Sequence, residues 1–507
     1  MPNRCTSKHR PRLSGLPLCL AAALLAGTGA ASAVELPKAV QKVPEKLDLK
    51  KAVNLPKPED EPGWDANRSY VIPAVDIVLF DFLLNRFDYY FIGKEDFDVS
   101  SSSIDHNLQS SWVVDNDSFE INQFGHPYQG SMYHTFARSA GLGYWTSLAY
   151  AFGGSAAWEV FGETTTPSWN DQISTGIGGT MLGEPLFRMA TLVLEDGFGL
   201  SPFWREVVAS AISPATAVNR RAWGDRFDSV FPNHAPAIMT RGQFGAILNA
   251  HVDGREASGD QFKRGQLSVD LLMQYGQPGK PGYRYTRPFD YFSFEFTAAS
   301  ANAFENISSR GLLWGTDFSW GDSHRAIWGL YGSYDYFAPQ LFRVSSTAVS
   351  LGTTGQVWLS KPLALQYTAM TGIGWGAAGT VRGVGERDYH FGMTLQQLLL
   401  ARTIYDDRVS MDFTLRNYHV GDRGGAEAKG SVENVARGEI GLTWRVSGPH
   451  GISLKYSEAN RDAHYPNTQD RHQQLGSVSL LYTWLGRSGF GAVEWRPGMN
   501  DTPSPVN

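Results

Sequence analysis

The sequence predicts an α+β fold in which a helical N-terminal domain precedes a twelve-stranded antiparallel transmembrane β-barrel. Three observations lead to this prediction. The C-terminal half consists of short runs in which apolar and polar residues alternate, as they do in strands with two different faces. These runs are even in number, and the segments between them are alternately short and long. All three features are typical of single-chain bacterial outer-membrane barrels.

Composition excludes several classes of protein. The chain has 507 residues, a net charge of −6 and only 19% charged residues. A nucleic-acid-binding protein would show a basic footprint, so no nucleic-acid partner is expected. Only Cys5 and Cys19 carry thiols, which excludes a disulfide scaffold and a cysteine-ligated metal site.

Residues 1–33 have the features of a secretory signal peptide. A positively charged segment precedes an apolar stretch from Leu16 to Ala26, and Ala31-Ser32-Ala33 supplies the small residues of a cleavage site. Residues 34–63 are polar and rich in Lys, Glu and Pro, so we expect them to form a flexible periplasmic tether.

Helical character extends over residues 64–225. The stretch from Ser139 to Trp158 has no charged residue, and its Gly and Ser content favours a helix packed against protein, inside or beneath the barrel. Gly179 and Gly183 have the spacing that lets two helices approach closely.

Two helix starts can be recognised within this region. Ser168 begins a capping-box pattern with Asp171 in place of the usual Glu or Gln. Ser201 places a cap before Pro202, a residue favoured in the first turn of a helix.

Strand character extends over residues 239–486. In the run from Leu267 to Tyr275 one face carries Leu, Val, Leu, Met and Tyr, whereas the other is mostly polar. The alternative is a soluble secreted β-sandwich, which would seldom reserve so many aromatic residues for one face. An apolar outer face and a polar inner face indicate a membrane barrel. The predicted strands lie near 241–251, 264–276, 288–300, 310–320, 324–337, 346–359, 363–377, 389–402, 408–419, 436–447, 450–459 and 475–485.

The connections between these strands predict how the barrel is oriented. Even-numbered connections, such as Gly448-Pro449, are tight, whereas odd-numbered ones, such as 421–435 and 460–474, are long and polar. The second connection, 277–287, is longer than this pattern requires. Short periplasmic turns and long outer loops would place both termini in the periplasm, with residues 487–507 as a C-terminal tail.

Isolated charged residues fall on the predicted inner face. We expect them to form an internal hydrogen-bonded network that fills a narrow barrel, with a transport pathway as the alternative. They are Asp270, Glu295, Asp317, Asp335, Arg416, Arg445 and Lys455.

Part of the helical region resembles a known family. The resemblance is carried by Asn122 to Tyr133 (NQFGHPYQGSMY), followed by Ala137-Arg138-Ser139, Trp158 to Glu163 (WEVFGE) and Pro167 to Asp171 (PSWND). These motifs resemble the bacterial outer-membrane family catalogued as domain of unknown function 3943, over about residues 64–225. The resemblance implies an envelope protein with a helical domain before its barrel, and it implies no reaction.

The polar residues among these apolar helices have two interpretations. In the first, they are buried ion pairs that fix how the helices pack, with Arg138 bound to a carboxylate and Glu184 to Arg188. In this interpretation Asp171 is only part of a helix cap.

In the second interpretation, Glu159 and Glu163 act with His126 or His134 as a general acid and base or as a metal site. The two-histidine spacing of the zincins is absent, so we assign no metal, and the lack of a phosphate or dinucleotide loop leaves no cofactor to assign. His126 precedes Pro127, so it could equally serve to position the chain. The candidate site residues are His126, His134, Arg138, Glu159, Glu163 and Asp171.

These patterns lead to two expectations for function. The first is an outer-membrane envelope protein whose helical domain plugs or caps the barrel, with a structural role or as a gated passage for a small solute or lipid. The second is an envelope enzyme that acts on lipid or cell-wall material. A binding platform on the long outer loops is a third class. Outer-membrane lipid is the expected partner, and the sequence names no protein partner.

Overall fold

The computed structural model describes residues 67–115, 117–254, 262–380, 389–421, 430–466 and 469–495. The predicted signal peptide and tether lie outside the described residues.

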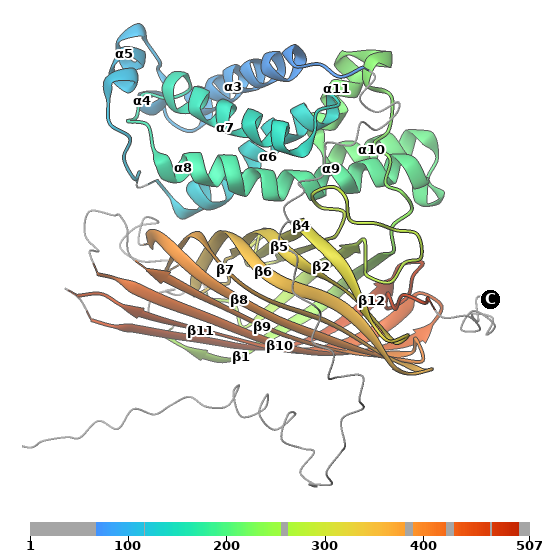
Figure 1. Ribbon diagram of the computed structural model, residues 1–507. Coiled ribbons are helices and arrows are strands. Elements are labelled where there is room, and N and C mark those ends of the chain that lie inside the picture. The colour runs from blue at the N-terminus through green and yellow to red at the C-terminus, as the bar shows by residue number, and fades with distance from the viewer. Residues whose placement is uncertain are drawn as a thin grey trace, which may run out of the picture. The chain divides into compact units, whose positions relative to one another are not determined.

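Twelve antiparallel strands close into a barrel in which β1 pairs with both β2 and β12. The prediction of a twelve-stranded barrel is therefore confirmed (Figure 1). The strands are β1 (Ile238–Asp253), β2 (Gly265–Tyr275), β3 (Phe292–Ala299), β4 (Asn306–Trp320), β5 (His324–Phe337), β6 (Phe342–Ser360), β7 (Leu363–Thr380), β8 (Tyr389–Tyr405), β9 (Val409–Gly421), β10 (Val432–Ser447), β11 (His450–His464) and β12 (Arg471–Leu485).

Several strands continue further toward the predicted outer loops than expected. β10 begins at Val432 and β11 ends at His464, so parts of the segments predicted as loops are paired strand. A hairpin ladder needs no apolar face to continue, because its backbone hydrogen bonds form equally well between polar residues. The apolar pattern therefore marks only part of each strand.

The two faces of the barrel wall are distinguished by contacts across the barrel. Lys455 on β11 binds Asp270 on β2, and Gln396 on β8 binds Ser333 on β5, so these residues face the lumen. The alternate residues face outward, and they include many exposed apolar side chains, such as Leu480 at 61%. This is the arrangement of a membrane barrel, with an apolar exterior and a polar interior.

Nine α-helices precede the barrel within the described residues. The uncharged stretch from Ser139 to Trp158 is helical from Tyr144, where α7 begins. α6 ends at Ser139, and in the turn between the two helices Gly141 adopts a φ of 84°. The helices are α3 (Val71–Phe91), α4 (Lys94–Phe97), α5 (Ser101–Gln109), α6 (His126–Ser139), α7 (Tyr144–Phe161), α8 (Trp169–Ile173), α9 (Gly179–Asp196), α10 (Pro202–Ile212) and α11 (Pro214–Ala222), of which α4 is a single turn.

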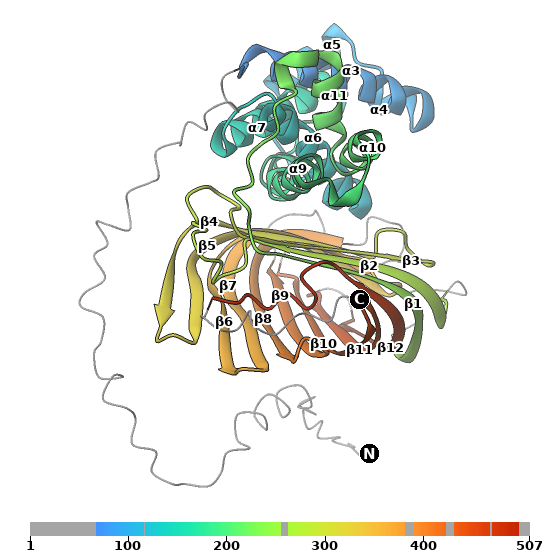
Figure 2. The same cartoon turned by 90° about the vertical axis from the view of Figure 1, so that its right-hand side faces the viewer.

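The helical domain packs against the outside of the barrel wall. Tyr334 on β5 donates a hydrogen bond to the carbonyl of Gln123, and Ser309 on β4 donates one to the carbonyl of Met181 on α9. Both side chains alternate with lumen-facing neighbours, so they point outward. Figure 2 shows the helices beside the ring of strands, with α9 seen end-on. The helices therefore do not plug the lumen, contrary to expectation, because their contacts are with outward-facing side chains.

The residues expected to form a free C-terminal tail are partly folded into the barrel. Gln356 and Trp358 on β6 point into the lumen, and both donate hydrogen bonds to the carbonyl of Val493. Gln366 on β7 donates one to the carbonyl of Gly491. Figure 2 shows this segment crossing the end of the barrel at which the short turns lie. Residues 486–495, here called the C-terminal strap, therefore close this end, and residues 496–507 lie outside the described residues.

Candidate functional sites

A cluster of charged residues lies at the centre of the helical domain. Glu184 on α9 has no exposed surface and binds three partners: Arg138 Nε at 2.7 Å, Arg188 Nε at 2.9 Å and His134 Nε2 at 3.0 Å. Burial alone would raise the pKa of Glu184, but the two guanidinium groups and His134 hold it well below its usual range. Glu184 is therefore an ion-pair partner that stays charged, which is the first interpretation of these residues.

The same cluster joins the helical domain to the barrel. Arg188 Nη1 lies 3.1 Å from Asp290 Oδ1, and Arg188 Nη2 donates to the carbonyl of Pro288, both in the connection between β2 and β3. The ring of Phe231 lies against the guanidinium groups of Arg138 and Arg188. Asp290 is not among the residues predicted from the sequence. The one signal that could have indicated it is the unusual length of the connection between β2 and β3.

A second cluster, here called the acid cluster, lies where α6, α7 and α8 meet. His126 Nε2 lies 3.7 Å from Asp171 Oδ2, and Ser168 Oγ donates a hydrogen bond to the same carboxylate oxygen. The backbone N–H of Ser168 donates to Glu159 Oε2 at 2.7 Å. Asn170 Nδ2 lies 3.0 Å from carboxylate oxygens of both Asp115 and Asp171.

Burial controls the protonation of the acid cluster. The pKa of Glu159 is raised to about 8, because burial and the nearby Asp115 and Asp117 outweigh the hydrogen bond from the Ser168 N–H, which lowers it. Burial also raises the pKa values of Glu163 and Asp171 well above their usual range. For His126, burial lowers the pKa to about 4. Glu159, Glu163, Asp171 and His126 are therefore uncharged near neutral pH, because desolvation disfavours their ionised forms.

The structure pairs the predicted site residues differently from the acid–base hypothesis. His126 pairs with Asp171 and His134 with Glu184, and within the described residues neither imidazole hydrogen bonds with Glu159 or Glu163. Glu159 Oε1 is buried without a hydrogen-bond partner in the described part of the chain. The predicted residues thus divide between two sites.

The helix starts are those predicted from the sequence, with one difference. Ser168 accepts a hydrogen bond from the N–H of Asp171 and begins α8, and Ser201 precedes Pro202 at the start of α10. In a capping box Asp171 would bind the N–H of Ser168, but Glu159 from α7 occupies that donor. The side chain of Asp171 is thereby available to Ser168 Oγ and Asn170.

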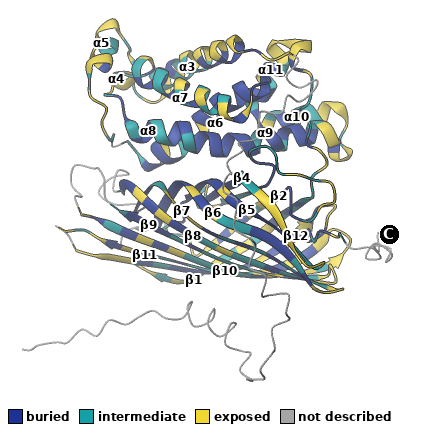
Figure 3. Cartoon of the chain, viewed as in Figure 1, coloured by how far each residue is buried: buried dark blue, intermediate teal, exposed yellow. Residues whose placement is uncertain are grey.

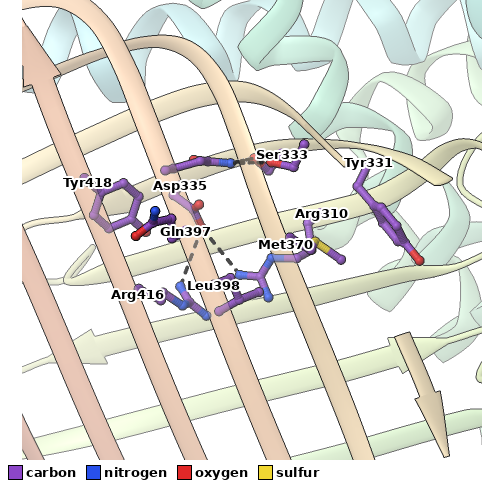
Figure 4. A pocket seen from close by; sticks show the side chains of 11 residues that line it. Arg310, Tyr331, Ser333, Asp335, Met370, Gln397, Leu398, Arg416 and Tyr418 are labelled. Atoms are coloured by element: carbon purple, nitrogen blue, oxygen red, sulfur yellow. Dashed lines mark hydrogen bonds and ion pairs between the residues drawn. The ribbon is translucent and has the colours of Figure 1, made fainter. Parts of the chain in front are cut away.

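The lumen is filled by paired polar side chains, as expected. Arg416 bridges Glu295 at 2.8 Å and Asp335 at 3.5 Å, and Arg445 binds Asp407. Figure 4 shows Asp335 between Arg310 and Arg416, beside a cavity of only about 20 Å³. A volume of this size holds about one water molecule. Another cavity, at the outer-loop half of the lumen, measures about 50 Å³.

Comparisons with known proteins agree with the family resemblance. Residues 111–215 match the family described as Domain of unknown function (DUF3943). Among solved structures, the chain is similar to the NanC porin, with 10% identity, a TM-score of 0.26 and coverage of 48% of this chain and 98% of that one. It is also similar to the outer membrane channel DcaP of Acinetobacter baumannii, with 8% identity, a TM-score of 0.22 and coverage of 50% and 99%.

A third similar structure is the translocator domain of autotransporter NalP from Neisseria meningitidis, with 12% identity, a TM-score of 0.21 and coverage of 49% and 86%. No curated protein matches the chain. None of the described helices combines the length and the hydropathy needed to cross a bilayer. No group of three or more His, Cys, Asp or Glu side chains in the described ranges is arranged to hold a metal ion.

Proposed function

We propose that the protein is a bacterial outer-membrane barrel with a structural role in the envelope, and that its resting form does not conduct solutes. The outward apolar face and polar lumen support the location. The observation that carries the closed state is the filled lumen, in which cross-barrel ion pairs leave cavities of about 20 and 50 Å³.

The C-terminal strap supports the same proposal from the other end of the lumen. The ring of Phe490 lies 5.4 Å from the Arg445 guanidinium, and the Phe490 N–H donates to Asp407. Trp358 packs in the same apolar cluster as Phe490. A solute leaving through this end would have to displace the strap and break these contacts.

Conductance in planar bilayers tests the proposal. We expect the purified mature protein to give no steady single-channel current at either polarity, because paired polar side chains of the described strands fill the lumen around Arg416. The variant for comparison ends at Gly486 and also carries Arg416→Ala. It therefore lacks the C-terminal strap and one of the paired cations of the lumen. Current in this variant alone supports a closed barrel, whereas steady current in the wild type refutes it.

An acid–base role for the acid cluster is the second candidate function, for an enzyme that acts on envelope lipid. It is favoured by the buried Glu159 oxygen that lacks a partner and by the His126–Asp171 pair. A neutral carboxyl group beside a neutral imidazole supplies one proton donor and one acceptor, which general acid–base chemistry requires.

A lipid-hydrolysis assay with phospholipid vesicles tests the second candidate. Loss of product release in His126→Ala and Glu159→Gln would support it, provided that both variants keep the wild-type circular dichroism spectrum. Equal rates in the wild type, both variants and protein-free vesicles would refute it.

A further inference from the structure

We infer that the outer face of α3 is a lipid-binding surface, so that the helical domain lies in the bilayer beside the barrel. The occupant of this face is the hydrocarbon of membrane lipid. The inference rests on the proposed location of the barrel in the outer membrane, and it adds a second lipid-facing part to the molecule.

The exposed face of α3 is almost entirely apolar. Phe82 is 60% exposed and Phe91 is 74% exposed. Figure 3 shows exposed residues along α3, whereas α6 and α9 beneath it are mostly buried. A contiguous apolar face of this length is rare on the water-facing surface of a soluble domain. The exposed apolar residues of α3 are Val71, Val75, Val78, Leu79, Phe82, Leu83, Phe87, Tyr90 and Phe91.

Three polar groups on α3 are directed into the domain, whereas Arg86 and Asp88 are half-buried. Asp81 accepts a hydrogen bond from the hydroxyl of Tyr133, and Asp76 accepts one from Trp223 Nε1 at 3.2 Å. Asn85 donates to the carbonyl of Gly162. A helix with polar residues inside and apolar residues outside has the opposite arrangement to a surface helix in water, and the arrangement expected next to lipid.

The interior of the helical domain has the packing of membrane helices. α6 and α9 cross through glycine, and a Cβ on Gly130 would lie 1.8 Å from the carbonyl oxygen of Thr175, while one on Gly179 would lie 2.5 Å from Gly130 Cα. The close approach predicted from Gly179 and Gly183 is thus present. Small residues at helix crossings are typical of bundles in lipid, and the buried Arg138 and Glu184 are paired, as the rare charged residues inside such bundles are.

The outer wall of the barrel in the same molecule carries exposed apolar side chains that also require lipid. Leu454 on β11 and Leu480 on β12 are more than half exposed on the outer wall. The helical domain lies against the outer face of β4 to β8, which elsewhere in the barrel faces the membrane. A helical domain bound to that face would replace the lipid next to the barrel. The side of the domain that points away from the barrel, which includes α3, would then contact lipid itself.

Site-specific fluorescence quenching in phosphatidylcholine vesicles tests the inference. Without the predicted signal peptide the chain has no cysteine, so single cysteines can be introduced at Leu79 and Leu83 and labelled with bimane. We expect doxyl-labelled phosphatidylcholine to quench both labels to within about twofold of a label at Leu454, because both would lie in hydrocarbon. Aqueous iodide should quench them far less than a label at Ser102, which is exposed on the polar helix α5.

The controls separate failure of the inference from failure of the proposed function. If doxyl lipid does not quench the label at Leu454, the barrel is not in the bilayer and the proposed location is wrong. If it quenches Leu454 while iodide quenches Leu79 and Leu83, α3 faces water and the inference alone is wrong. Protection of both α3 labels from both quenchers would also overturn it, because a protein partner would then cover the face. Heat-modifiable migration on gels verifies that each variant is folded.

Discussion

At the scale of single residues, Glu184 is the group on which the helical domain most depends. It holds two guanidinium groups and an imidazole in an environment without solvent, so its negative charge compensates buried positive charge. Pairs of this kind add little net stability compared with apolar packing, but removing one member leaves a buried charge without a partner.

We therefore predict that Glu184→Ala lowers the free energy of unfolding of the helical domain by about 3–5 kcal/mol, since Arg138 and Arg188 stay buried. The helical circular dichroism signal during denaturation in detergent measures it. Glu206→Ala is the matched control, because Glu206 pairs with Arg220 where its side chain is 28% exposed, and a pair at the surface contributes less than about 1 kcal/mol. Equal losses in the two variants would contradict the prediction.

The acid cluster predicts a dependence of stability on pH. The folded pKa of Glu159 is about 8, whereas its ordinary value is 4.5, so between these values the folded state holds a proton that the unfolded chain has lost. Stability must fall as pH rises in this range. His126 acts in the opposite direction below pH 6.5, because its folded pKa is lowered to about 4. The effect of Glu159 is therefore clearest between pH 6.5 and 8.

We expect the helical domain to lose stability from pH 6.5 to 8, and Glu159→Gln to reduce this slope by up to about 1.4 kcal/mol per pH unit. The glutamine can still accept the hydrogen bond of the Ser168 N–H. Thermal melts at several pH values measure the slope, with Glu95→Gln on the exposed surface as control. A slope unchanged by Glu159→Gln would show that Glu159 is ionised in the folded protein.

The sequence could predict the chemistry of these residues but only some of their partners. Spacing of four along a helix placed Glu184 next to Arg188, and the structure contains that ion pair. Contacts between segments that are distant in the sequence cannot be predicted from residue spacing. His126 meets Asp171 and Arg188 meets Asp290 only through the folding of separate helices and a barrel connection.

At the scale of helices and strands, alternation was the informative pattern. All twelve predicted strands are present, because a barrel wall between lipid and a polar lumen imposes two different faces on every strand. The helical domain is harder to predict because α3 exposes its apolar face and turns polar residues such as Asp76 and Asn85 inward. The uncharged stretch from Ser139 to Trp158 likewise gave no sign of the turn at Gly141.

The close crossing of α6 and α9 predicts that alanine in place of glycine destabilises the helical domain only at the crossing. Gly130→Ala should destabilise the helical domain by about 3 kcal/mol, because the added methyl group would overlap the backbone of Thr175 and force the helices apart. Gly153→Ala in α7 is the matched control. Its Cβ would meet no atom within 4 Å, and alanine is the better helix former, so a gain of up to about 1 kcal/mol is expected. Thermal melts of the helical signal compare the two, and equal losses would refute the close crossing.

At the scale of the whole molecule, the helical domain supports the weakest part of the barrel. β3 is the shortest strand within the described residues, and its ladder with β4 extends only from Phe292 to Thr297. The wall continues through the preceding connection, where the Phe289 N–H donates to the carbonyl of Leu312. Arg188 of the helical domain binds Asp290 in this extension.

This arrangement couples the two parts of the protein, and Asp290→Ala tests the coupling. The substitution removes the acceptor of Arg188 and of the N–H groups of Thr286 and Arg287, so the extension loses its turn and its anchor together. We expect the substitution to lower the free energy of unfolding of the barrel by about 3 kcal/mol, which corresponds to a melting temperature lower by about 5–10 °C. Heat-modifiable migration on gels reports barrel melting, and Asp462→Ala, which removes an exposed pair with His472, is the control. A barrel that melts at the wild-type temperature while the helical signal is lost earlier would mean that the barrel closes at β3 without help from the helices.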